Sequence, residues 1–164
     1  MLMEALNGLD HKFMYEITGH SGETHKLPLV EFGMPPRNRR ERLAVVSKMA
    51  KHAAECSSGD NTLAAGSLAI QNVRKEEADD YFVFLISDAN LEGYGVSAQN
   101  LAMALSSDPK VNAYCFFIAE PGIAQEMADR MPAGRAHVIL ENDAMPMLLK
   151  DIFARALLSN RSCL

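Results

Sequence analysis

The sequence is short of several features that would each indicate a particular class of protein. Its 164 residues include no tryptophan and only three cysteines (Cys56, Cys115 and Cys163), with no C-x-x-C pair. An odd number of widely spaced cysteines argues against a disulfide framework and favours a reducing compartment. Basic residues number sixteen against twenty-one acidic ones. This balance argues against nucleic acid as the main partner, because phosphate binding needs a basic surface.

Signals for membranes, secretion and nucleotide hydrolysis are missing as well. No apolar run in the sequence reaches membrane-spanning length. The first residues have neither the basic start nor the apolar stretch of a signal peptide. There is no G-x-x-x-x-G-K-[ST] phosphate loop, so we expect no nucleotide binding and no ATP hydrolysis by this chain. The length suits a single domain that buries a sizeable core.

The most informative segment that is present covers residues 81–90. Six apolar residues, from Tyr81 to Ile86, lead directly into Ser87 and Asp88. An unbroken apolar run of this length predicts a strand that is buried on both faces. An acid that follows such a strand lies at the carboxyl edge of a parallel sheet, where open α/β folds bind their ligands. Asp88 is therefore a candidate metal ligand, although a turn or cap role after a strand would also explain it.

The remaining sequence alternates between strand and helix patterns. After the end of a helix at residues 1–8, a hairpin is predicted from strands at 12–18 and 27–32, with Pro28 favouring a sheet edge. The segments that follow are helices 38–56 and 62–76, strand 81–87, helix 97–106, strand 111–119, helix 123–131, strand 137–140 and helix 144–159. Such alternation predicts an α/β fold of three layers, a mostly parallel sheet with helices on both faces.

Several of these segments together resemble a known family. The motifs are Gly19-His-Ser-Gly22, Pro35-Pro36, Ser58-Gly-Asp-Asn-Thr-Leu63, Ala78-Asp-Asp-Tyr-Phe82, Ser87-Asp-Ala-Asn-Leu91, Asp108-Pro-Lys-Val-Asn-Ala-Tyr114 and Pro132-Ala-Gly-Arg-Ala136. They resemble the von Willebrand factor A (VWA) domain at the carboxyl-terminal end of a mitochondrial AAA+ ATPase family. The resemblance covers nearly the whole chain, so we interpret residues 1–164 as a single, partial VWA domain.

The resemblance implies a metal-ion-dependent adhesion site that holds Mg²⁺. In the family, hydroxyl and carboxylate oxygens from three loops surround the ion, and a partner's carboxylate completes its shell. Asp88 matches the third loop. The second loop lies in Asp60-Asn61-Thr62, where Thr62 fits by residue type and Asp60 fits by its place after Gly59. A helix N-cap role for Thr62 and an Asx turn at Asp60 are the alternatives.

The first element of that site, a D-x-S-x-S loop, does not occur in the sequence. In the family this loop follows the central strand of the sheet. We therefore expect an amino-terminally truncated domain that lacks the first central strand and the start of its helix, and a metal site that is incomplete.

From this resemblance we predict a non-catalytic protein-binding module. It would contact a protein partner through the carboxyl edge of the sheet, belong to a longer protein with upstream ATPase domains, and reside in mitochondria, or otherwise in the cytoplasm. Tyr94, between two glycines beside Asp88, is a candidate partner contact. The alternatives are a metal-free structural or regulatory fragment and a small α/β hydrolase. Four arginines at the start of helix 38–56 are either a solvated face or a docking surface for an acidic partner: Arg37, Arg39, Arg40 and Arg42.

Overall fold

The computed structural model describes residues 3, 6, 12–56, 59–118, 120–141 and 144–161 (of 157–161 the backbone only). The helix end predicted at residues 1–8 lies almost wholly outside this part of the chain. The chain divides into two compact units, residues 1–61 and 62–164. The interpretation as one partial domain stays a prediction.

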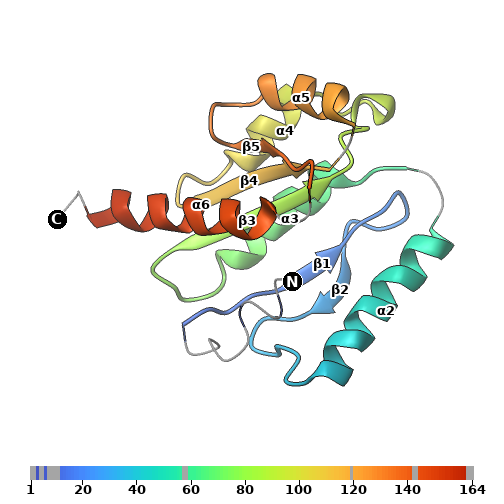
Figure 1. Ribbon diagram of the computed structural model, residues 1–164, viewed down its shortest axis with the longest axis vertical. Helices are drawn as coiled ribbons and strands as arrows, with labels where there is room; N and C mark the ends of the chain where they lie inside the picture. The colour runs from blue at the N-terminus through green and yellow to red at the C-terminus, as the bar shows by residue number, and fades with distance from the viewer. Residues whose placement is uncertain are drawn as a thin grey trace. The chain divides into compact units, whose positions relative to one another are not determined.

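The first unit contains a short hairpin and one long helix (Figure 1). Strands β1 (Ile17–Gly19) and β2 (Leu27–Val30) pair antiparallel, with an irregular register between Ile17 and Thr18. Both strands are shorter than predicted. The ladder pairs Ile17–Gly19 with Leu27–Val30, so residues 12–16 lie outside it.

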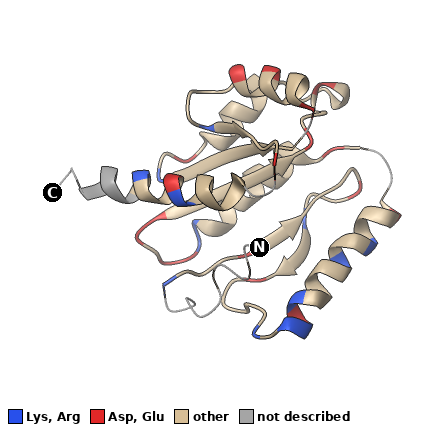
Figure 2. Ribbon diagram, in the orientation of Figure 1, with Lys and Arg blue, Asp and Glu red and all other residues tan. Residues whose placement is uncertain are grey.

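Helix α2 (Arg39–Glu55) begins at a capping box. The Asn38 side chain accepts a hydrogen bond from the Glu41 N–H at 3.0 Å, and the Glu41 carboxylate accepts from the Arg37 N–H at 2.7 Å. These bonds satisfy amide groups that a helix start leaves unpaired. Apolar side chains on α2 stay exposed, including Leu43, Val46 and Met49. Basic residues gather at its first turn (Figure 2).

The second unit is built on a parallel sheet of three strands in the order β3-β4-β5. Strand β3 (Tyr81–Ser87) pairs in register with β4 (Val111–Phe117), and β4 pairs with β5 (Ala136–Val138). Aromatic and β-branched residues dominate β3, as is typical of strands. The helices are α3 (Thr62–Val73), α4 (Ala98–Leu105), α5 (Pro121–Asp129) and α6 (Ala144–Arg161), with a 3₁₀ turn η1 at Glu92–Tyr94. The predicted α/β fold with a parallel sheet is therefore confirmed.

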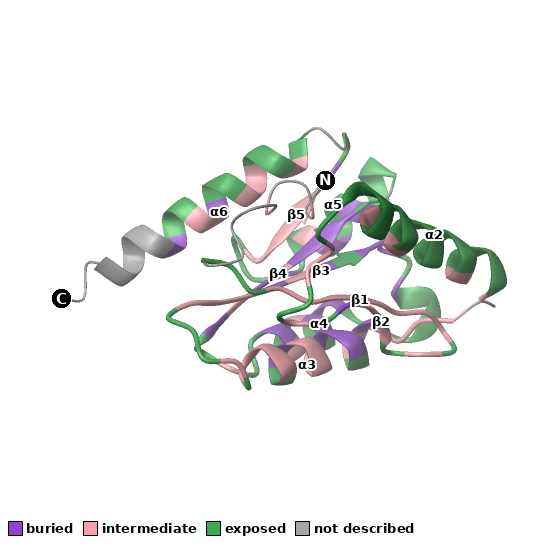
Figure 3. Ribbon diagram, turned by 90° about the horizontal axis from the view of Figure 1, so that it is seen from below, coloured by how far each residue is buried: buried purple, intermediate pink, exposed green. Residues whose placement is uncertain are grey.

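Helices cover both faces of this sheet, as predicted (Figures 1 and 3). Apolar residues of α3, α4 and α5 form one buried cluster with inward-facing residues of β3 and β4, such as Leu85 and Phe117. On the other face, α6 packs against Phe116 and the partly buried rings of Phe82, Phe84 and Tyr114. The helix predicted over residues 97–106 starts where expected, because the Ser97 side chain caps α4 by accepting from the Asn100 N–H at 3.1 Å.

One prediction about β3 is wrong. The strand is buried on one face only, where Val83, Leu85 and Ser87 are less than 9% exposed. On the α6 face, Phe82 and Phe84 are half-buried, and Ile86 is 47% exposed. An apolar run alone does not tell how much of each face the neighbouring helices reach. In this sheet α6 leaves the carboxyl end of that face open.

Candidate functional site

Asp88 lies where the sequence placed it, directly after β3 at the carboxyl edge of the parallel sheet. Its side chain is exposed, and its Oδ1 accepts a hydrogen bond from the Asn90 N–H at 3.1 Å. One residue earlier, the Ser87 Oγ accepts from the Ala89 N–H at 3.2 Å. Two successive side-chain-to-backbone bonds therefore close the turn. They hold the carboxylate of Asp88 at the surface.

The turn contains a strained residue that sequence reasoning did not single out. Ala89 has φ +62° and is the only non-glycine with positive φ among the described residues. A left-handed conformation costs a non-glycine residue roughly 1–2 kcal/mol. Ala89 is 3% exposed and belongs to the buried cluster beneath the sheet edge. Core packing thus holds the strained backbone in place, and strain that packing maintains is typical of functional turns.

The chain beyond Asp88 is fastened to α5. Arg130, next to the end of α5, forms ion pairs with Glu92 in η1 and with Glu126. Gly95 ends η1 with φ +74°, a conformation that favours glycine. Tyr94 lies on this turn with 45% of its surface exposed. Tyr94 is therefore at the surface, six residues after Asp88 in the chain. Its contact with a partner stays a prediction.

In the first unit, the loop before α3 packs against the hairpin turn. Gly59 has φ +134°, and a Cβ there would lie 2.8 Å from the Cα of Gly22. The Asn61 Nδ2 donates to the backbone oxygens of Ser21 and Gly22 at 2.7 and 3.0 Å. Gly-His-Ser-Gly is thus a turn that receives this loop, as the hairpin interpretation predicts. The positioning role of Asn61 was missed, because nothing in its local sequence reveals a contact with a residue forty positions away.

The predicted metal ligands belong to both units, Asp60 to the first and Thr62 and Asp88 to the second. Thr62 has no exposed surface, and both Thr62 and half-buried Asp60 already take part in interactions. Among the described residues there is no group of three His, Cys, Asp or Glu side chains that could hold a metal ion. Hydroxyl and carboxylate oxygens suit Mg²⁺ in kind, and Mg²⁺ commonly keeps several waters in its octahedral shell. Coordination by Asp88, Thr62 and Asp60 stays a prediction.

Two ionisable groups with shifted pKa values lie away from this turn. Burial raises the pKa of the Cys115 thiol to about 12, and the residue has no exposed surface. A thiol in this state is unreactive at neutral pH, so Cys115 acts as a small hydrophobic residue of the core. Burial also lowers the pKa of His137, whose ring lies beside that of Phe116 on the α6 face of the sheet.

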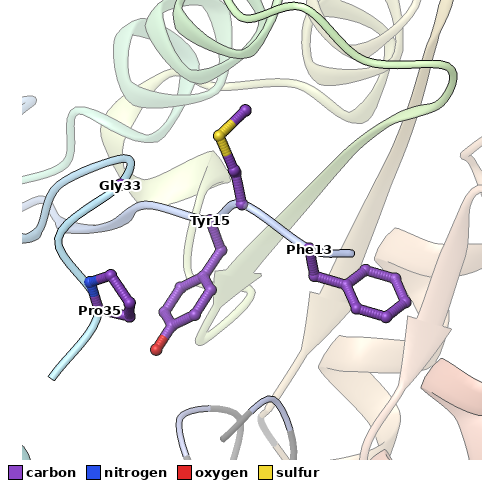
Figure 4. A pocket seen from close by; sticks show the side chains of 5 residues that line it. Phe13, Tyr15, Gly33 and Pro35 are labelled. Carbon is purple, nitrogen blue, oxygen red and sulfur yellow. The ribbon is translucent and has the colours of Figure 1, made fainter. Parts of the chain in front are cut away.

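One surface cavity, of about 220 Å³, lies under α6, and another, of about 150 Å³, lies in the first unit. Figure 4 shows the cavity in the first unit: the ring of Tyr15 lies beside Pro35, whereas Phe13 points away from them. Met14 and Gly33 complete its lining, which carries no charged side chain. We find no arrangement for chemistry in it. Within the part of the chain that is described, no helix has the length and apolar character needed to span a bilayer.

A parallel sheet covered by helices on both faces, with an acidic turn at its carboxyl edge, is an α/β arrangement consistent with a VWA or Rossmann-like fold. The chain is similar to von Willebrand factor A domain-containing protein 8 of Mus musculus, with 40% identity over 161 residues. This match confirms the resemblance that the motifs indicate. It covers 98% of the chain but 8% of the length of that relative. No family model matches the sequence, and no solved structure matches it.

Proposed function

We propose that this chain is a non-catalytic protein-interaction module whose partner contacts the carboxyl edge of the parallel sheet. The observation that carries this proposal is the turn at Asp88. An exposed carboxylate follows strand β3 of the core, and strained Ala89 anchors the turn in the buried cluster. The similarity to a protein that contains a VWA domain supports the same function. By the same resemblance, the module would act within a longer mitochondrial protein that carries AAA+ ATPase domains.

A pair of photo-crosslinkers tests where the partner binds. We would place one photoreactive residue at Tyr94, beside the Asp88 turn, and the other at Asp79, which is exposed just before β3 at the opposite edge of the sheet. In mitochondrial extract, a defined crosslinked protein is expected from position 94 and not from position 79. Equal yields from both positions would contradict a partner site at the carboxyl edge.

The metal component of the proposal needs its own measurement. Calorimetric titration of Mg²⁺ into this chain and into an amino-terminally extended form compares their affinities directly. We expect binding by the extended form, with loss of that binding on Asp88→Asn and no change on Asp79→Asn. If the extended form does not bind Mg²⁺, the adhesion-site component fails, while the crosslinking result decides the interaction function independently.

A second candidate function is a structural or regulatory role without metal. It is favoured by the complete burial of Thr62 and by the lack of a three-ligand cluster in the described residues. The two candidates differ in one observable. Under the metal-free alternative, crosslinking from position 94 is unaffected by EDTA, whereas an adhesion site that needs Mg²⁺ loses its crosslinks on chelation.

A further inference from the structure

Exposed hydrophobic side chains gather at one edge of the second unit. In the described part of residues 62–164, every exposed large hydrophobic side chain except Met103 lies at the end of a strand or in the segment that follows it. They are Ile86 on β3, Tyr94 in η1, Ile118 after β4, Ile123 in the first turn of α5, Leu140 after β5 and Met147 in the first turn of α6. In a parallel sheet these segments belong to the carboxyl edge. Hydrophobic side chains that gather on one surface mark an interaction site, whereas scattered ones need no explanation.

The centre of this surface is set by the register of β3 and β4. Ile86 pairs with Phe116, and the Ile118 N–H donates to the Ser87 carbonyl at 2.8 Å, so the ladder continues one residue beyond β4. Side chains alternate between faces along a strand, which puts Ile86, Phe116 and Ile118 on the same face. Phe116 is 1% exposed, whereas Ile86 and Ile118 are 47% and 40% exposed. Two branched aliphatic side chains are therefore open to solvent on neighbouring strands, next to the Asp88 turn.

An acidic residue follows each strand at the same edge. Asp88 follows β3, Glu120 follows β4 and Glu141 follows β5. All three side chains are exposed, and none forms an ion pair with another described residue. The three connections contain no lysine or arginine; they comprise residues 86–97, 118–123 and 139–147. The apolar surface therefore has an acidic rim without basic counterparts in its own segments.

Two sources of positive charge near this edge do not balance the carboxylates. Arg130, next to the end of α5, is already paired with Glu92 and Glu126. Helices α3, α4, α5 and α6 begin on the side where the strands end, and each helix start carries a partial positive charge of roughly half a unit that fades within one turn. The exposed carboxylates carry full charges outside the helices. An approaching partner therefore meets a surface that is negative overall and apolar at its centre.

We propose that the partner segment at this edge is a peptide in which an aliphatic or aromatic side chain is flanked by lysine or arginine. The apolar side chain covers Ile86 and Ile118, and the basic side chains pair with Asp88 and Glu120. Apolar contacts at the centre of an interface supply affinity, and complementary charges at its rim set association rate and specificity. The same acidic rim repels nucleic acids and anionic membranes. The inference rests on the proposed function, because it specifies the partner of the same edge, but it needs no bound Mg²⁺.

Selection of short random peptides on the whole chain tests the chemistry of the partner segment. We expect enriched sequences in which Lys or Arg flanks a large apolar residue. Fluorescence anisotropy then measures the dissociation constant of an enriched peptide. Ile118→Ser should weaken its binding about tenfold, whereas Met103→Ser, the matched control on α4, should leave it unchanged. Raising NaCl from about 50 to 500 mM should also weaken binding, because the charge pairs are exposed and are screened by salt.

An exchange of charges between chain and peptide tests the acidic rim. The Glu120 side chain makes no capping hydrogen bond, so its replacement should leave α5 intact. Glu120→Lys should weaken binding of the enriched peptide, and a peptide with glutamate in place of its basic residues should bind this variant better than the wild type. Asp79→Lys, at the opposite edge of the sheet, is the control and should alter neither affinity. If a variant does not fold, the composition of the peptides selected by the wild type decides the matter.

Several results would overturn the proposal. They are acidic or uncharged enriched peptides, a lack of enrichment, equal losses on Ile118→Ser and Met103→Ser, and failure of the charge exchange. Self-association of the wild type that Ile118→Ser abolishes would assign this surface to a second copy of the chain and overturn it as well. Equal crosslinking yields from positions 94 and 79 refute the partner site itself, whereas unequal yields with acidic enriched peptides refute this inference alone.

Discussion

The two faces of the parallel sheet differ in how completely they are covered. The face under α3, α4 and α5 contacts a large buried cluster that includes Leu101, Cys115 and Phe117, each with no exposed surface. The α6 face has a smaller buried cluster of Phe116, Ile139 and Ile152. The first face consists mainly of aliphatic and small residues. The second face is lined by aromatic rings, and it holds the cavity with His137.

The two faces of the sheet therefore differ in how much they contribute to stability and in how much room they leave for a ligand. Hydrophobic stabilisation is roughly proportional to the apolar area removed from water, so the better-covered face contributes more of it. The α6 face is incompletely covered, and the cavity there is lined in part by the charged residues Asp151 and Arg155 of α6. We infer that the first face mainly specifies the fold, whereas the second has room for a ligand. Four predictions test this contrast, in order of decreasing effect.

The largest expected effect is the difference in unfolding free energy lost when alanine replaces Phe117 on one face and Phe84 on the other. Phe117→Ala, with the side chain fully buried, should lower the free energy of unfolding by about 3–5 kcal/mol. Phe84→Ala removes a half-buried ring that contacts Tyr114, Phe116 and Phe153, and should cost about 1–2 kcal/mol. Urea unfolding monitored by circular dichroism measures both. Equal losses would show that the α6 face is packed as tightly as the other.

The same substitution at two glycines should act in opposite directions. In α3, a Cβ at Gly66 would meet Leu85 and Leu105 at ordinary van der Waals distances of 3.5 and 3.7 Å. Gly66→Ala should therefore stabilise the first face by about 0.5–1 kcal/mol through helix propensity. Gly59→Ala should cost about 1–3 kcal/mol, because its φ of +134° and the nearby Gly22 backbone exclude a side chain. A loss on Gly66→Ala would mean that this face is already overpacked.

The strain at Ala89 can be measured against a residue of equal burial. Ala89→Gly loses a buried methyl group but relieves a positive φ, so stability should change by less than about 0.5 kcal/mol. Ala98→Gly, also 3% exposed, loses a methyl group without any relief of strain and should cost about 1 kcal/mol. Thermal melts of both variants provide the comparison. Identical losses would exclude backbone strain as a property of the Asp88 turn.

The smallest expected effect is the pH dependence of stability that His137 contributes on the α6 face. Burial lowers the pKa of His137 in the folded chain, so below the ordinary value near 6.5 the unfolded state binds more protons than the folded state. The stability contribution of neutral His137 is present above that pH and is lost as pH falls toward the folded pKa. Unfolding free energies of wild type minus His137→Asn should therefore increase from about pH 5 to pH 8 in chloride. A difference independent of pH would contradict burial of this imidazole.

Most elements could be predicted because their signals are local. The cap at Ser97, the apolar run of β3 and the helix that begins at Thr62 depend on neighbours in sequence, and the structure has each of them at its predicted position. The exposure of Ile86 could not be predicted, since it depends on how far α6 extends over the sheet. The contact of Asn61 with the turn at Ser21 and Gly22 likewise joins distant segments. The ligand roles of Asp60, Thr62 and Asp88 stay predictions.

The sequence by itself determined the order of strands and helices, the acidic turn after β3 and the family resemblance, because hydrophobic period, capping residues and motifs are properties of contiguous segments. Only the tertiary structure decided which face of the sheet is well covered, that Ala89 is held in a strained conformation, and that His137 and Arg155 line one cavity. Those features arise from packing between elements far apart in the chain. Packing depends on the shapes and distances of side chains, which the sequence pattern does not contain.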